Sequence, residues 1–274
     1  MFRSRAVQLL TICAALVLAT AESGDYARAQ GRLEASYGIS LAHIRVGEIT
    51  ATLVLGNSDY TISAQARAGG IMKVLVEGEG SFTTRGNIKD DHPLPTNFTA
   101  KIVSKAASSD VTMVLEDGSV KELVATPPPP PRSGIVPVTE DRQAIIDPLT
   151  AMLVSGATGE GLSQEACRRT LPVFDGRERY DLKLAFKRMD NVTAEKGYAG
   201  PVVVCSVRYE AIAGHRASAP LVKYLSEGRE IEVALGPAVG MHLLAPFRVS
   251  AMSMVANLVI EAMNRSGFAG GSNS

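Results

Sequence analysis

The stretch VTMVLEDGSVKELV, residues 111–124, decides the fold class. Residues 111–115 and 120–124 are rich in apolar and β-branched side chains, which favour strands. Between them lies Glu116-Asp117-Gly118-Ser119, and an Asp-Gly pair readily takes the positive φ angles that a tight hairpin turn requires. The stretch therefore predicts two antiparallel strands joined by a short turn.

The sequence before this hairpin continues the strand pattern back to Leu33. Residues 44–55 alternate over their second part, which places Ile49, Ala51, Leu53 and Leu55 on one face. Residues 60–66 alternate again, and residues 98–104 form a further strand. Residues 33–125 thus predict a meander of antiparallel strands.

Five consecutive prolines, residues 127–131, follow the meander. Each proline lacks a backbone N–H, which excludes the run from a helix or a sheet interior. It predicts a stiff polyproline II spacer, within a linker at residues 126–137.

A helical segment is expected next, at residues 138–170. Thr139 is a candidate N-cap for its first helix. Asp147 can cap a second helix, which has Pro148 at its first position and ends at Gly156.

Strands resume in the second half, residues 173–262. Residues 179–189 alternate and place Tyr180, Leu182, Leu184 and Phe186 inward. Residues 202–209, 230–235 and 241–249 give further strands, and residues 251–260 are expected as a last strand in preference to a helix. The glycine-rich end, residues 263–274, predicts a disordered tail.

These elements predict a mainly β protein, with residues 22–262 as a single domain. The expected architecture is a large curved antiparallel sheet, or open barrel-like meander, of about ten to twelve strands. Two or three short central helices between the halves 33–125 and 173–262 would plug its concave face, where we expect an apolar cavity. The absence of βαβ alternation argues against a doubly wound parallel sheet.

The first residues predict a secretory signal. Arg3 and Arg5 precede an uncharged stretch, residues 6–21, which ends in the small-x-small pattern Ala19-Thr20-Ala21. Cleavage is expected after Ala21, or alternatively after Ala29. No later window is long and uncharged enough to predict a membrane span.

Removal of residues 1–21 changes the charge and cysteine counts. The chain has 28 Lys and Arg, 28 Asp and Glu and three Cys. The mature chain loses two arginines and Cys13, so it is slightly acidic, which argues against a nucleic-acid partner. Two cysteines in an exported protein predict one disulfide, Cys167–Cys205, and the alternative is two buried free thiols.

Motifs for catalysis and metal binding are missing from the sequence. The four histidines do not stand at HxxxH or HxH spacing, and neither GxSxG nor a P-loop occurs. We therefore expect no cofactor and no metal, and we assign no catalytic residue.

Polar residues beside two strands of the second half form a candidate ligand rim. If these strands are neighbours, the rim could bind a small polar or anionic ligand. The alternative is an ordinary turn network with weak surface ion pairs. The six candidates are Asp175, Arg177, Arg179, Asp181, Tyr209 and His215.

Several short motifs resemble an exported bacterial family catalogued as domain of unknown function 3108. They are residues 37–48 (YGISLAHIRVGE), 147–149 (DPL), 173–182 (VFDGRERYDL) and 205–209 (CSVRY), and the resemblance covers about residues 33–262. It implies a periplasmic, β-rich protein. It implies no activity and therefore no catalytic residue.

Two hypotheses for function follow. The first is a non-enzymatic exported envelope protein whose curved sheet binds an apolar or amphipathic ligand, such as a lipid, or docks an envelope partner. The alternative is a periplasmic hydrolase that acts on a cell-envelope polymer through the rim of Asp175, Arg177, Asp181 and His215. Two carboxylates about 5–9 Å apart in a cleft would favour the hydrolase, and a deep apolar cavity without convergent acids would favour the binding protein.

Overall fold

The structure is a computed structural model. It describes residues 31–69, 78–105, 107–128, 135, 144–156, 162–216, 218–228, 230–238, 242–252 and 256–269. The predicted signal segment, most of the proline-rich linker and the predicted helix start at Thr139 lie outside these residues.

The first half is a meander of seven strands. They are β1 (Gly31–Leu41), β2 (Ile44–Leu55), β3 (Asp59–Ala68), β4 (Gly78–Lys89), β5 (His92–Ser104), β6 (Ser108–Glu116) and β7 (Ser119–Thr126). Each strand pairs antiparallel with the next. Asp117 and Gly118 have φ angles of 47° and 72°, so the Asp-Gly turn takes the predicted conformation between β6 and β7.

The second half contributes eight strands. They are β8 (Val154–Ser155), β9 (Arg169–Phe174), β10 (Arg179–Thr193), β11 (Lys196–Gly197), β12 (Ala199–Ala213), β13 (Ile231–Pro237), β14 (Leu243–Met252) and β15 (Asn257–Ala269). The helical elements of the described chain are the 3₁₀ turns η1 (Thr150–Met152) and η2 (Gln164–Cys167) and the helix α2 (Pro220–Ser226).

All fifteen strands belong to one sheet. Its order is β7-β6-β5-β4-β3-β2-β1-β15-β14-β13-β12-β10-β9, and the short β8 and β11 pair with β14 and β15 beside this path. The halves join where the first strand pairs with the last, from Gly31 opposite Ala269 to Leu41 opposite Leu258. The predicted mainly β fold with one large antiparallel sheet is confirmed, and the edge strands β7 and β9 leave it unclosed.

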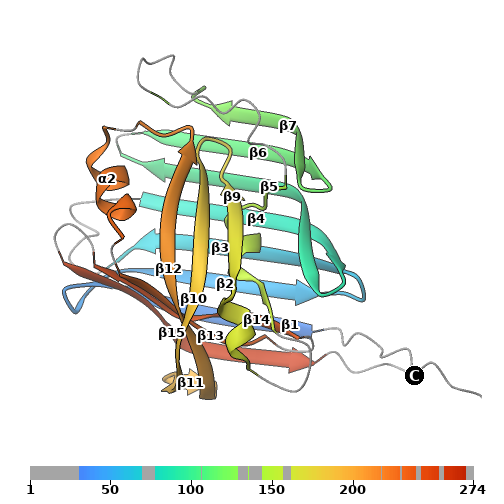
Figure 1. Ribbon diagram of the computed structural model, residues 1–274, viewed down its shortest axis with the longest axis vertical. Coiled ribbons are helices and arrows are strands. Elements are labelled where there is room, and N and C mark those ends of the chain that lie inside the picture. The colour runs from blue at the N-terminus through green and yellow to red at the C-terminus, as the bar shows by residue number, and fades with distance from the viewer. Residues whose placement is uncertain are drawn as a thin grey trace, which may run out of the picture.

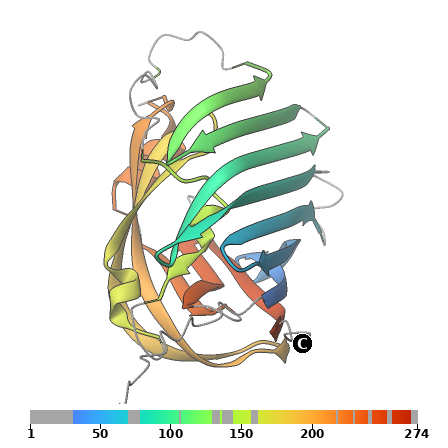
Figure 2. The same ribbon diagram turned by 90° about the vertical axis from the view of Figure 1, so that its right-hand side faces the viewer.

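The sheet folds back on itself, so that its two halves face each other. In Figure 1, β9, β10 and β12 run across the strands of the first half, and Figure 2 shows the two sets on opposite sides of the molecule. Residues 144–149 lie between the two free edges of the sheet and contact both. There the N–H of Ile145 donates to the carbonyl of Gly118 in the β6–β7 turn, and Ile146 bridges to Val173 of β9.

The prediction of two or three central helices is wrong for the described residues. The stretch after Asp147 forms only the three-residue turn η1 and then β8, which pairs with β14. The segment is too short for a stable helix, and Val154 and Ser155 pair with β14 instead. The one α-helix among the described residues, α2, lies in the second half between β12 and β13.

Three expectations for the second half also need correction. β15 continues to Ala269, so residues 263–269 of the predicted tail are strand, because they pair with β1. Residues 251–260 are not one strand but the end of β14 and the start of β15. Phe186 is 38% exposed, and the register of β10 against β12 shifts directly after it, where a bulge interrupts the alternation.

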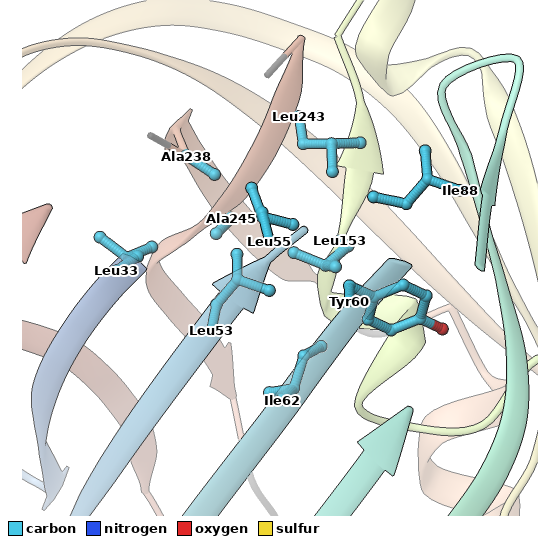
Figure 3. Close-up of a cluster of buried hydrophobic side chains, with 10 residues drawn as sticks. All are labelled: Leu33, Leu53, Leu55, Tyr60, Ile62, Ile88, Leu153, Ala238, Leu243 and Ala245. Atoms are coloured by element: carbon cyan, nitrogen blue, oxygen red, sulfur yellow. The ribbon is translucent and has the colours of Figure 1, made fainter. Parts of the chain in front are cut away.

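The core lies between the facing halves. One cluster gathers Leu33, Leu53, Leu55, Tyr60, Ile62, Ile88, Leu153, Ala238, Leu243 and Ala245. Figure 3 shows side chains of β1, β2 and β3 converging with Leu153 and with those of β14. A second cluster joins β5 and β6 to Ile145 and to Phe174 of β9, where the free edges approach. Both halves therefore bury apolar surface against each other.

Candidate functional site

A cavity of about 580 Å³ lies against the sheet of the first half. Its wall includes a row of side chains that stand opposite one another across six neighbouring strands, which we call the middle row. The middle row consists of Ala35, Ala51, Ala64, Phe82, Ala100 and Val111. Four of these six are alanine, so the sheet surface is hollow where larger side chains would fill the space.

Two further rows flank the middle row on the same face. Leu33, Leu53, Ile62, Thr84, Phe98 and Met113 form the floor row, and all six are buried. Tyr37, Ile49, Ala66, Gly80, Ile102 and Ser109 form the outer row. Ile102 is 47% exposed, so the cavity is closed at the floor row and opens beyond the outer row.

The opposite wall comes from residues 148–153, which include the turn η1, and from the strand β14. Pro148, Leu149, Met152 and Leu153 line the cavity from the first, and Ala245, Pro246 and Val249 from the second. The segment 147–153 lies where the sequence predicted helices, and we call it the plug. Apolar side chains supply most of the lining, and its charged members are Asp175, Arg177 and Arg248.

Asp147 anchors this plug. Its Oδ1 accepts the N–H groups of Leu149 and Thr150 at 2.9 and 3.1 Å, which caps the turn. Its Oδ2 accepts the hydroxyls of Thr150 and of Thr84 on β4. The hydroxyl of Tyr60 on β3 lies 2.7 Å from that of Thr150, so the network ties the plug to two strands of the first half.

Burial governs the titration of this network. The side chain of Asp147 is inaccessible to solvent, and burial raises the pKa of its carboxyl although four hydrogen bonds oppose the shift. Burial also raises the pKa of Tyr60, so its hydroxyl stays neutral and keeps its proton for the hydrogen bond to Thr150. The plug is thus held by polar groups that water does not reach.

Two of the six predicted rim residues line the cavity, Asp175 and Arg177. They belong to the turn between β9 and β10, where Asp175 Oδ1 accepts the N–H groups of Arg177 and Glu178, each at 2.7 Å. This is the turn network that the sequence left as the alternative. Arg177 Nη2 reaches across to β6 and β7, and donates to Ser109 Oγ at 3.2 Å and to the carbonyl of Pro127 at 2.9 Å.

The other four rim candidates do not line the cavity. Arg179 and Asp181 pair with each other at 2.6 Å. The ring of Tyr209 lies 5.3 Å from that of Tyr180, which does line the cavity, and burial raises the pKa of Tyr209 to about 12. His215 is buried beside the β9–β10 turn, and its Nδ1 has no hydrogen-bond partner among the described residues.

Glu178 stands in the same turn. Burial raises the pKa of its carboxyl, the negative charge of Asp175 raises it further, and His215 lowers it. The six candidates thus lie in and near one turn, and two of them line the cavity.

The predicted disulfide Cys167–Cys205 is present, with Cα atoms 5.4 Å apart. It joins η2 to β12, and both sulfurs are buried. No cluster of three or more His, Cys, Asp or Glu side chains suited to a metal occurs among the described residues. No helix in the described part of the chain has the length and apolar character needed to cross a membrane.

Sequence reasoning missed the middle row. Its members come from six strands, and the signal in each strand is a single alanine, phenylalanine or valine on the inward face. The alternation that put Ile49, Ala51, Leu53 and Leu55 on one face is confirmed, because the first two line the cavity and the last two join the core. The buried network of Asp147 with Thr84 was also missed, since these residues lie 63 positions apart.

The comparisons with known proteins concern fold and family. One similar solved structure is the crystal structure of a beta-barrel-like protein of domain of unknown function DUF1849 from Brucella abortus. It is 10% identical, with a TM-score of 0.46, and the match covers 88% of this chain and 98% of that one. No curated protein matches the sequence. The family of proteins of unknown function DUF3108 matches residues 34–262, so the chain belongs to this family.

Proposed function

We propose that this protein is a non-enzymatic, exported envelope protein that holds an apolar or amphipathic ligand in the cavity. The observation that carries the proposal is the apolar cavity itself, bounded by strands β1–β6, by β14 and by the plug. Its volume of about 580 Å³ lies within the range of about 300–1,000 Å³ that is usual for small-molecule sites.

The energetics favour an apolar occupant. Each methylene group moved from water into an apolar site gains about 0.8 kcal/mol. The middle row and the plug residues offer such surface, and Met152 is 42% exposed in this structure. A bound chain would cover these side chains.

The hydrolase hypothesis finds less support. Hydrolysis of a glycosidic bond usually needs two carboxyl groups on either side of the bond. Among the described residues that line the cavity, Asp175 supplies the one carboxylate, and its Oδ1 is occupied by two backbone N–H groups. Asp181 is paired with Arg179 and does not line the cavity.

Two observations support export. The first residues have the pattern of a cleavable secretory signal. The disulfide between η2 and β12 is of a kind that persists in oxidising compartments such as the bacterial periplasm. We therefore propose a periplasmic location.

Native mass spectrometry of the protein purified from its own envelope, followed by lipid extraction, tests the proposal. We expect a stoichiometric apolar or amphipathic molecule. A ligand-free mass, together with failure to bind the neutral apolar dye N-phenyl-1-naphthylamine, would overturn it.

Ala64→Phe tests whether the cavity is the site. Ala64 is in the middle row, so the larger ring would occupy the space of the ligand, and we expect dye binding to weaken at least about tenfold. Gln65→Phe is the matched control, because Gln65 is the next residue on the same strand and is exposed. Equal dye binding by both variants would place the ligand elsewhere.

A further inference from the structure

The cavity contains a cation with no carboxylate partner in the described chain. Arg248 pairs with Glu261 at 3.5 Å. Arg177 donates to Ser109 Oγ and to the carbonyl of Pro127, and both acceptors are neutral. Its guanidinium therefore stands at the cavity wall without a paired anion among the described residues.

The position of Arg177 defines one end of the cavity. Ser109 is the last member of the outer row. It lies two residues before Val111 on β6, which stands opposite Ala100 of β5 in the middle row. A chain lying along the middle row toward β6 would thus bring its end group to Arg177. Tyr180 also lines this end, and burial raises the pKa of its hydroxyl, which remains a neutral donor.

The volume limits the size of the occupant. A cavity of about 580 Å³ lies in the range of about 300–1,000 Å³ that is usual for sites holding one small molecule. We therefore take a single acyl chain as the occupant.

We propose that the ligand is a single-chain amphiphile with an anionic head group, whose chain lies on the middle row and whose head pairs with Arg177. This inference rests on the proposed function and names the ligand class of the same cavity. A guanidinium binds a carboxylate by charge-assisted hydrogen bonds, which are stronger than those it now makes to neutral oxygens.

Nearby acids restrict the charge of that head group. Asp175 lines the cavity beside Arg177, and Glu178 and His215 lie around the same turn. Asp175 repels an anion, so a head with a single negative charge, such as a carboxylate, fits better than a doubly charged phosphate.

Displacement of N-phenyl-1-naphthylamine by dodecanoate and by dodecan-1-ol tests the inference, at pH 8 and below the micellar range. The two compounds have equal chains and differ in the charge of the head. We expect the protein to bind dodecanoate at least about tenfold more tightly than the alcohol. We expect didodecanoyl phosphatidylglycerol, which has two chains, to displace the dye at least about tenfold less well than dodecanoate.

Three variants assign the preference to this end of the cavity. Arg177→Gln should bring the affinity for dodecanoate down to that for the alcohol, and Arg177→Lys should retain most of the preference. Asp175→Asn keeps an oxygen for the N–H groups of the turn and should strengthen dodecanoate binding more than that of the alcohol. The melting temperature of each variant checks that it is folded.

The outcomes separate the two proposals. If no compound displaces the dye and the dye itself does not bind, the proposed function fails. If dodecanoate and the alcohol bind the protein equally, or if Arg177→Gln leaves the preference intact, the head-group inference is overturned while the binding function stands. The comparison of the two compounds on the unaltered protein decides the question even if Arg177→Gln does not fold.

Discussion

Asp147 is the residue on which the plug depends. Its carboxylate is buried and accepts hydrogen bonds from two backbone N–H groups and from two threonine hydroxyls. Buried polar groups are costly when they lose their partners, because neither water nor protein then satisfies them. The side chain therefore fixes where the plug enters the space between the halves.

Asp147→Ala should destabilise the fold by about 2–4 kcal/mol, since it leaves buried donors unsatisfied. Asp147→Asn should cost less than about 1 kcal/mol, because its oxygen still accepts from the backbone and the hydroxyl of Thr84 can turn to Asn97. Urea unfolding at pH 7 measures both. Equal losses for the two variants would contradict the assigned role.

The raised pKa of Asp147 predicts a pH dependence of stability. The folded state binds the proton more readily than the unfolded state, so the free energy of unfolding falls as the pH rises from about 4 through the folded-state value. Asp147→Asn removes this contribution. The stability of the variant relative to the unaltered protein should therefore increase from pH 4 to pH 7, and a constant difference would contradict the assignment.

The Asp-Gly turn between β6 and β7 is hydrogen-bonded to the segment that precedes the plug. Gly118 has a φ of 72°, and its carbonyl accepts the N–H of Ile145. A Cβ at this position would lie 3.2 Å from the Cα of Ala144. Glycine is needed here both for the backbone conformation and for the close approach of the neighbouring segment.

Gly118→Ala should destabilise the protein by about 1–3 kcal/mol, because it adds crowding to the strain of a left-handed backbone. Gly228→Ala is the matched control. Its φ is 75°, but the nearest atom to its Cβ would be the end of the Arg208 side chain at 3.5 Å. We expect a larger loss of melting temperature for Gly118→Ala, and equal losses would show that the contact with Ala144 adds nothing.

The antiparallel pairing of β1 with β15, which we call the seam, joins the two halves of the molecule into one sheet. Residues 145 and 146 and the β9–β10 turn then join the opposite edges, through Ile145, Val173 and Arg177. Two apolar clusters of the described chain draw buried residues from both halves and so couple them, and two further clusters bury residues of the second half.

We therefore expect both halves to unfold in one cooperative transition. Urea unfolding followed by far-ultraviolet circular dichroism should coincide with unfolding followed by exchange of the backbone amides of β3 and of β12. Two separate midpoints would mean that the seam does not couple the halves.

Local patterns in the sequence are enough to predict the mainly β fold class and most strands of the first half. Period-two alternation and the Asp-Gly pair are local properties, and they predicted β2, β3, β5, β6 and β7, because one face of each strand is buried and the other is not. They did not predict β4, whose glycines interrupt the pattern. The short motifs at residues 147–149 and 173–182 indicated the family, and the cysteine count indicated the disulfide.

The cavity depends on tertiary contacts, which no local pattern in the sequence predicts. Whether Ala35, Ala51 and Ala64 stand side by side depends on the register of three strands, and a shift of one residue would turn each side chain to the other face. The meeting of Arg177 with Ser109 joins residues 68 positions apart, across the gap between the sheet edges. Such contacts follow from the packing of the whole chain, and a local pattern contains no information on which distant strand will lie opposite.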